Sequence, residues 1–131
     1  MIGSVGRLTV LVHDQDEALR FYTGPLGFRV IADVELAGGF RALHVGPPGS
    51  DTGIWLMPAT GEEQRERVGR QTAGEPIGVL YTADCRGAVD QLRANGVRIV
   101  TDLVETGDSR FAHLLDLYGN EFVLVELAAN G

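Results

Sequence analysis

Apolar and polar residues alternate in short runs along the chain, and the period of this alternation changes from two to about 3.6 in two places, which predicts strands interrupted by two helices. The first helix is predicted to begin after Asp14 or Asp16, either of which would cap it, and to end at Gly24-Pro25. The second is predicted to begin at Asp84 and to end at Asn95-Gly96. The other apolar runs predict strands over 6–12, 29–34, 40–45, 53–57, 77–83, from 97 onward, 111–115 and 122–127.

The stretch 110–127 predicts a β-hairpin. Two apolar runs flank the turn sequence DLYGN at 116–120, and its Gly-Asn pair is expected to supply backbone positions with positive φ. One strand carries a histidine, His113, within an apolar run. The other strand ends on Glu126, which we interpret as a lone exposed carboxylate.

The two halves of the chain repeat one another at an offset of about 70 residues, which is the signature of an internal repeat. Asp14 corresponds to Asp84, and the sequence around Phe40 corresponds to that around Phe111. The repeat predicts an α+β fold of two tandem βαβββ modules in a single domain. The predicted parts are a first module over about 1–57, a linker or solvated half-helix over about 58–75, and a second module over about 76–131.

One such module leaves a face of its sheet uncovered. Pairing the sheets into a curved, half-open mixed barrel with flanking helices solves this problem, and its concave side becomes available for a ligand.

Composition and charge narrow the classes of partner. A chain of 131 residues with a net charge of −7 disfavours nucleic acid and anionic lipid, because both reward a concentrated basic surface. No apolar run approaches the length of about 20 residues that a membrane span needs. The single cysteine, Cys85, excludes an internal disulfide, and the N-terminal residues do not read as an export signal, so a cytoplasmic location is expected.

With the segment 11–30 (LVHDQDEALRFYTGPLGFRV), the DLYGN turn and the Asn-Gly-Val at 95–97, the chain resembles the vicinal oxygen chelate superfamily. That superfamily includes glyoxalase I, ring-cleaving dioxygenases, fosfomycin-resistance thiol transferases and bleomycin-resistance proteins. The resemblance covers nearly the whole chain and implies the fold already predicted. It also implies a homodimer.

The resemblance implies that metal-using members hold a divalent ion with His and Glu side chains at four positions, which fall here at Arg7, Trp55, Gly78 and Val123. None of these side chains offers an oxygen or imidazole ligand. A register error of one residue would not change this, because the neighbours of Trp55 and Gly78 are aliphatic. We therefore expect no metal and no cofactor.

The resemblance and the alternation of side chains along strands together place five residues around one cavity: Arg7, Thr9, Trp55, Phe111 and His113. In the fosfomycin-resistance enzymes, the positions that match Thr9 and His113 look toward the ligand. Each residue also has a plainer interpretation. Arg7 could be an edge charge, Trp55 a core residue, and His113 a core histidine bonded to a backbone carbonyl. His13 is expected to be exposed or to act as a cap, and the sequence leaves the facing of His44 and Phe40 open.

The leading hypothesis is a metal-free protein of the bleomycin-resistance type that binds and sequesters a hydrophobic or aromatic compound such as an antibiotic. The alternative is a lyase, isomerase or transferase with His113 as general base and Arg7 holding an anionic intermediate. A third possibility is a domain whose cavity is filled by its own side chains.

Overall fold

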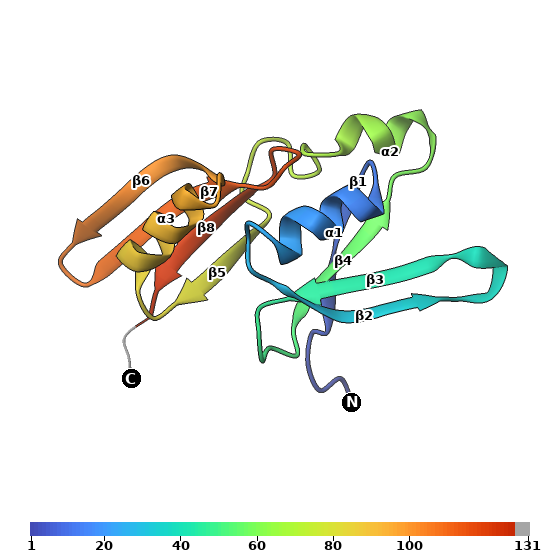
Figure 1. The fold of residues 1–131 in the computed structure, drawn as a ribbon, viewed down its shortest axis with the longest axis horizontal. Helices are drawn as coiled ribbons and strands as arrows, with labels where there is room; N and C mark the ends of the chain where they lie inside the picture. Colours follow the sequence, from blue (N-terminus) through green and yellow to red (C-terminus); the bar gives the residue numbers. More distant parts are fainter. Residues whose placement is uncertain (128–131) are drawn as a thin grey trace. The chain divides into compact units, whose positions relative to one another are not determined.

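The computed structural model describes residues 1–127, and the chain divides into two units, Met1–Gly69 and Arg70–Gly131 (Figure 1). Each unit contains one βαβββ module, so the predicted α+β class and tandem modules are confirmed. The first module consists of β1 (Arg7–Val12), α1 (Gln15–Thr23), β2 (Arg29–Glu35), a 3-10 turn (Ala37–Gly39), β3 (Arg41–Gly46) and β4 (Gly53–Pro58), and α2 (Gly61–Arg67) follows it. The second consists of β5 (Gly78–Thr82), α3 (Cys85–Ala94), β6 (Arg98–Thr106), β7 (Ser109–Leu115) and β8 (Glu121–Glu126).

Both modules have the same sheet topology. The four-stranded sheet of the first module, here called sheet A, has the strand order β1-β4-β3-β2, and that of the second, sheet B, has the order β5-β8-β7-β6. In each sheet the first and last strands of the module run parallel, and the other neighbours run antiparallel. The first strand therefore lies beside the last, and their side chains meet on the same face.

The two long helices begin at the aspartates that the sequence indicates. The Asp14 side chain accepts the backbone N–H of Glu17 at 2.9 Å, and the Asp84 side chain accepts that of Gly87 at 3.0 Å. Both capping residues have extended backbones, as a residue that precedes a helix requires. The same cap thus starts the crossover helix in both modules.

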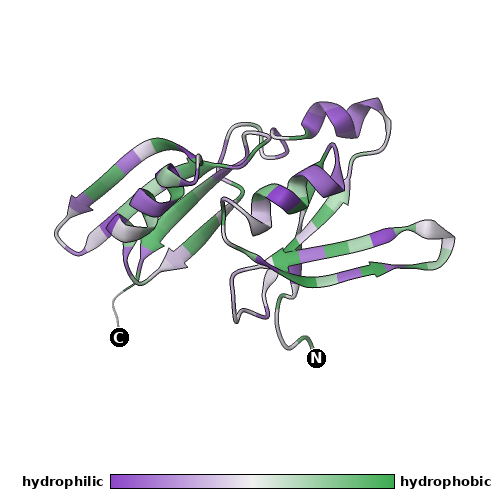
Figure 2. Ribbon diagram, in the orientation of Figure 1, coloured by the Kyte–Doolittle hydropathy of each residue, from purple (hydrophilic) through white to green (hydrophobic). Residues whose placement is uncertain are grey.

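Each module has its own hydrophobic core between its helix and one face of its sheet (Figure 2). Along the strands, buried and less buried positions alternate, which identifies the covered face. Tyr22 of α1 is fully buried, and Phe28 is nearly so. The covered faces comprise Val10, Val12, Leu43, Val45, Ile54 and Leu56 in sheet A, and Ala112, Leu114, Phe122 and Leu124 in sheet B.

Within the segment 58–75, predicted as a linker or solvated half-helix, the chain forms the short helix α2. None of its residues is buried, and it is the most uniformly hydrophilic helix in Figure 2. Its charge-dense sequence has no apolar stripe, so it buries no side chain against a sheet.

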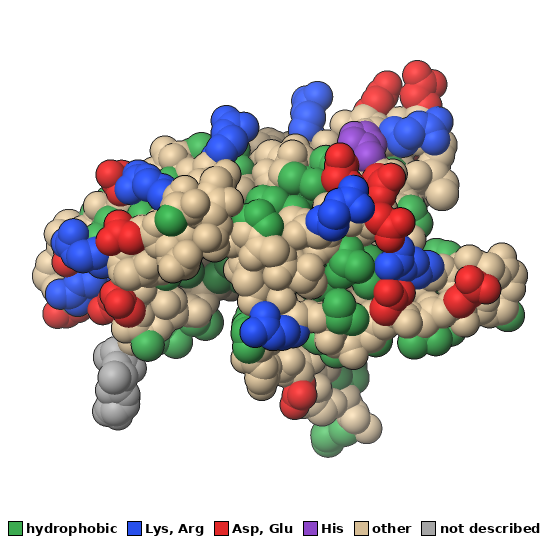
Figure 3. Space-filling view, in the orientation of Figure 1, with side chains coloured by type: hydrophobic (Ala, Val, Ile, Leu, Met, Phe, Trp, Pro, Cys, Tyr) green, Lys and Arg blue, Asp and Glu red, His purple; other side chains and the backbone are tan. Residues whose placement is uncertain are grey.

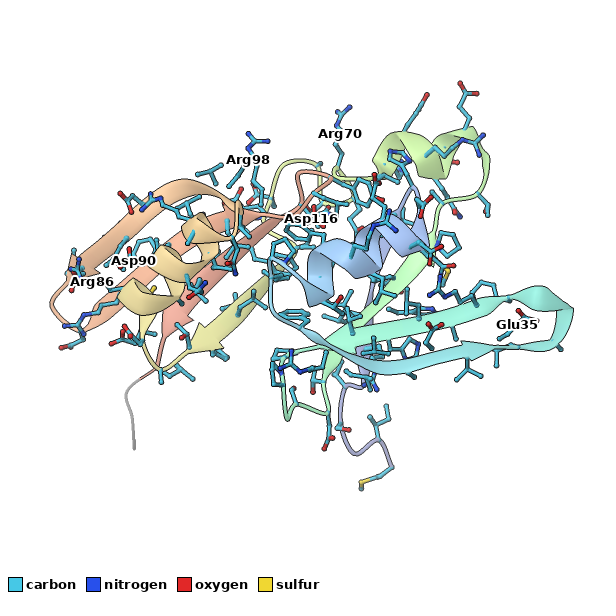
Figure 4. All side chains as sticks on the ribbon, in the orientation of Figure 1. Glu35, Arg70, Arg86, Asp90, Arg98 and Asp116 are labelled. Carbon is cyan, nitrogen blue, oxygen red and sulfur yellow. The ribbon has the colours of Figure 1, made fainter. Side chains whose placement is uncertain are left out.

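The turn between β7 and β8 has the predicted position, but only half of its predicted backbone. Gly119 has φ +93°, whereas Asn120 is not among the residues with positive φ. Asn120 is instead buried, and its side-chain amide donates to the carboxylate of Asp116 at 2.9 Å. The prediction that the Gly-Asn pair supplies positive φ was therefore wrong for Asn120, which stabilises the turn through its side chain. Figure 4 labels Asp116 at this turn.

Among residues 1–127, no helix is long and apolar enough to cross a membrane. On the face shown in Figure 3, acidic and basic side chains lie interspersed.

Candidate functional site

Sheet A has a second face, opposite α1, that carries polar and aromatic side chains. Thr9 pairs with Trp55 across the parallel strands β1 and β4, and His44 pairs with the same Trp55 across β3 and β4. Arg7 lies two residues before Thr9 and therefore on the same face. We call Arg7, Thr9, His44 and Trp55 the open face of sheet A.

Arg7 is held in place by neutral acceptors. Its Nε donates to Nδ1 of His44 at 3.2 Å, and one terminal nitrogen donates to the backbone carbonyls of Gly6 at 2.7 Å and Asp51 at 2.5 Å. These bonds fix the guanidinium beside the imidazole. They leave its positive charge without a carboxylate partner among the contacts observed in residues 1–127.

Two ring nitrogens of the open face, one of His44 and one of Trp55, lack hydrogen-bond acceptors. In the described part of the chain, neither His44 Nε2 nor Trp55 Nε1 has a hydrogen-bond partner, although both atoms are buried. Burial, and secondly the charge of Arg7, lower the pKa of His44 below its usual value, which favours the neutral imidazole. Because Nδ1 accepts from Arg7, the proton of the neutral ring lies on Nε2.

Aromatic rings surround these donors. The ring of Trp55 lies 5.5 Å from that of His44 and 6.2 Å from that of Phe40, both in edge-to-face geometry. Phe40 precedes β3 and is 38% exposed. Edge-to-face packing leaves part of each ring face available for a further ring.

On sheet B, the corresponding face carries a histidine with a different partner. His113 of β7 pairs with Val123 of β8, and its ring lies 5.9 Å from that of Phe111. His113 Nδ1 lies 2.5 Å from Oε2 of Glu121, and both side chains are about a quarter exposed. The carboxylate orients the imidazole and leaves Nε2 to interact with another group.

The structure groups the five sequence-predicted residues into two sets. Arg7, Thr9 and Trp55 share the open face of sheet A, and Phe111 and His113 share a face of sheet B. His13 is exposed, as expected.

Three further residues belong beside these sets but were not predicted: His44, Phe40 and Glu121. Leu43 and Val45 are apolar and flank His44, so strand alternation alone could have placed it on the face opposite the core. Glu121 of β8 pairs with Leu115 of β7, two residues from His113. The length of the turn between the two strands sets this register and so brings Glu121 near His113.

Glu126 is not the lone exposed carboxylate that the sequence suggested. It accepts the backbone N–H of Cys85 at 2.9 Å and a hydrogen bond from Arg110 at 3.3 Å. It therefore helps to satisfy the start of α3, a contact between distant segments that the sequence pattern does not reveal. Burial raises the pKa of the Cys85 thiol, with a smaller contribution from Glu126, which makes this cysteine a poor nucleophile.

The side chains at the four positions where the resemblance implies metal ligands do not fit a divalent cation. Arg7 is a hydrogen-bond donor to His44 and to carbonyl groups, and Trp55 offers only an N–H. Gly78 has no side chain, and Val123 is aliphatic. Within residues 1–127, no three His, Cys, Asp or Glu side chains gather closely enough to hold a metal ion.

Comparisons with known proteins agree with this fold. Residues 4–124 match the family model of the Glyoxalase/Bleomycin resistance protein/Dioxygenase superfamily. An uncharacterised protein of Shewanella frigidimarina is 32% identical over 126 residues, which span 95% of this chain and 93% of that protein.

Two solved structures are also similar. UcmS2 is 31% identical with a TM-score of 0.83, and the match covers 95% of this chain and 98% of UcmS2. TnmS3, described as an antibiotic binding protein from Streptomyces sp. CB03234, is 28% identical with a TM-score of 0.79, and the match covers 97% and 98% of the two chains.

Proposed function

Because this chain belongs to the glyoxalase/bleomycin resistance protein/dioxygenase superfamily, we propose that it is a metal-free, homodimeric protein that binds a hydrophobic or aromatic small molecule. Its biological role would be to sequester a compound such as an antibiotic without converting it.

The observation that carries this proposal is the open face of sheet A. It presents the guanidinium of Arg7 and the indole of Trp55 at two positions where metal-using relatives would need carboxylates or imidazoles, and the rings of His44 and Phe40 lie beside them. Sites for drug-like molecules combine apolar and aromatic surface with a few placed polar groups. The similarity to TnmS3, which is described as antibiotic binding, supports the same class of ligand.

A thermal-shift screen against aromatic natural products tests the proposal. A ligand present at 100 times its dissociation constant adds about 2.7 kcal/mol to the free energy of unfolding and raises the melting temperature measurably. A broad panel that gives no stabilisation would count against the proposal.

Two variants show whether stabilisation comes from the open face of sheet A. Trp55→Ala removes the central ring of that face and should abolish the ligand-induced shift. Val100→Ala removes a half-exposed side chain of β6, outside the proposed site, and should retain it. Retention of the full shift in Trp55→Ala would show that the ligand binds outside the open face of sheet A.

A specific contact favours an enzymatic alternative, in which His113 acts as general base. Its Nδ1 lies 2.5 Å from a Glu121 oxygen, an arrangement that fixes the orientation of the ring, as a general base requires. The reaction would be a proton abstraction in a lyase, isomerase or transferase.

Mass spectrometry after incubation distinguishes the two functions. Sequestration returns each bound compound unchanged, whereas the alternative yields a product in the wild type and not in His113→Ala. The His113→Ala variant should still bind the compound under the alternative, which separates lost chemistry from lost affinity.

A further inference from the structure

The hydrogen bonds of Arg7 and the unpaired ring nitrogens of His44 and Trp55 indicate the chemistry of the ligand. Resting on the function proposed above, we propose that the open face of sheet A selects aromatic compounds that carry an anionic oxygen, such as a carboxylate or phenolate. Aromatic cations would be poor ligands.

The charge of Arg7 is the first argument. Some arginines of the chain pair with carboxylates, such as Arg41 with Asp16 and Asp33, and Arg110 with Glu105 and Glu126. Arg7 instead donates to an imidazole and to carbonyl oxygens, which orient it without neutralising it. A positive charge positioned in this way favours an anion and repels a cation.

The second argument is the set of donors beside it. The proton of neutral His44 lies on Nε2, because Nδ1 accepts from Arg7, and the indole Nε1 of Trp55 is always a donor. Neither N–H has an acceptor among residues 1–127, and both are buried. Burying a donor without an acceptor is unfavourable, so an oxygen supplied by a ligand would relieve that cost. Donors alone do not select a cation, which has no lone pair to offer.

The third argument concerns the rings and access to these donors. An oxygen can reach the indole N–H only if a covering side chain turns aside. Phe40, which contacts Trp55 edge-on and is 38% exposed, is more exposed than His44, the other ring beside Trp55, and is the side chain that we expect to move. A planar ligand that displaces it would stack between the two aromatic side chains while its oxygen meets the donors.

Two probes of equal ring size and opposite charge test the proposal: 2-naphthoate and 2-naphthylmethylammonium. Titration calorimetry of the full chain should show the carboxylate binding roughly tenfold to hundredfold more tightly, as a charge-assisted hydrogen bond predicts. Trp55 is the only tryptophan, so the protein has a single indole N–H resonance. That resonance should shift downfield on addition of naphthoate.

Variants separate the charge from the ring. Arg7→Met and Trp55→Phe each keep much of the side-chain volume and should reduce the preference for naphthoate over the ammonium probe. Arg98→Met removes an exposed arginine of β6 and should leave that preference unchanged.

The outcomes also separate this inference from the proposed function. Equal affinity for both probes, or an indole resonance that does not move, would overturn the inference, while ring binding itself would still support the function. Failure of both probes to bind at millimolar concentration would overturn the inference as well. The proposed function would then be judged by the natural-product screen alone.

Discussion

Two histidines occupy corresponding positions in the two modules, but the side chains that they contact have opposite charge. His44 pairs with Trp55 on the last strand of the first module, and His113 pairs with Val123 on the last strand of the second. The neighbour of His44 is the guanidinium of Arg7, and that of His113 is a glutamate carboxylate. The repeat therefore preserves the place of the imidazole while its chemistry has diverged.

The environment of His44 predicts a pH dependence of stability. Burial and the charge of Arg7 hold its pKa below the usual value of 6.5, so the unfolded chain takes up the proton first as the pH falls. The contribution of neutral His44 to the free energy of unfolding is complete above about pH 6.5. It is lost as the pH falls through the pKa of His44 in the folded state, which is lower.

Chemical denaturation as a function of pH checks this prediction. The wild type should lose stability more steeply below about pH 6.5 than His44→Gln, which cannot titrate there. Arg7→Met should raise the pKa of His44 only part of the way back to its usual value, because the imidazole remains buried. An NMR titration of the imidazole measures this pKa. Parallel stability curves for the wild type and His44→Gln would contradict the prediction.

Asp116 is predicted to contribute strongly to stability. The residue is 4% exposed, and its carboxylate accepts hydrogen bonds from the backbone N–H groups of Tyr118 and Asn120 and from the Asn120 amide, each at 2.9 Å. Asp116→Ala leaves these donors without their acceptor and should lower the free energy of unfolding by roughly 3 kcal/mol. Asp108→Ala, in the exposed turn between β6 and β7, should change it by less than about 0.5 kcal/mol. Urea denaturation measures both, and similar losses would show that the turn network is unimportant.

At the scale of elements, the sequence predicts the regular parts well, because each is encoded by its own period and punctuation. Asp14 and Asp84 mark both helix starts, and alternation marks the strands. What the sequence does not reveal are contacts set by register between strands, such as the pairing of His44 with Trp55. The pairing of β2 with β3 shifts between Val30 and Ala32, opposite Val45 and His44, and the local sequence does not reveal a shift of this kind.

The two caps give a prediction that applies to both modules. Asp14→Ala and Asp84→Ala each remove the acceptor of a first-turn N–H and should each lower the free energy of unfolding by about 1 kcal/mol. Asp→Asn at either position keeps an accepting oxygen and should retain most of the stability. Thermal and urea unfolding of the four variants check this. An asparagine variant as unstable as its alanine counterpart would indicate that charge, rather than the cap, matters.

At the scale of the whole molecule, the proposed homodimer gives a prediction about assembly. Val79 and Tyr81 of β5 are 52% and 66% exposed, and Leu8 of β1 is 59% exposed, which is unusual for large apolar side chains of strands. Light scattering coupled to size-exclusion chromatography should give twice the chain mass of 14.1 kDa at micromolar concentration. Tyr81→Arg should shift the protein toward monomer, because a charge in an apolar interface lacks a partner, whereas Tyr81→Phe should not. A monomeric wild type would show that these side chains face solvent in the functional protein.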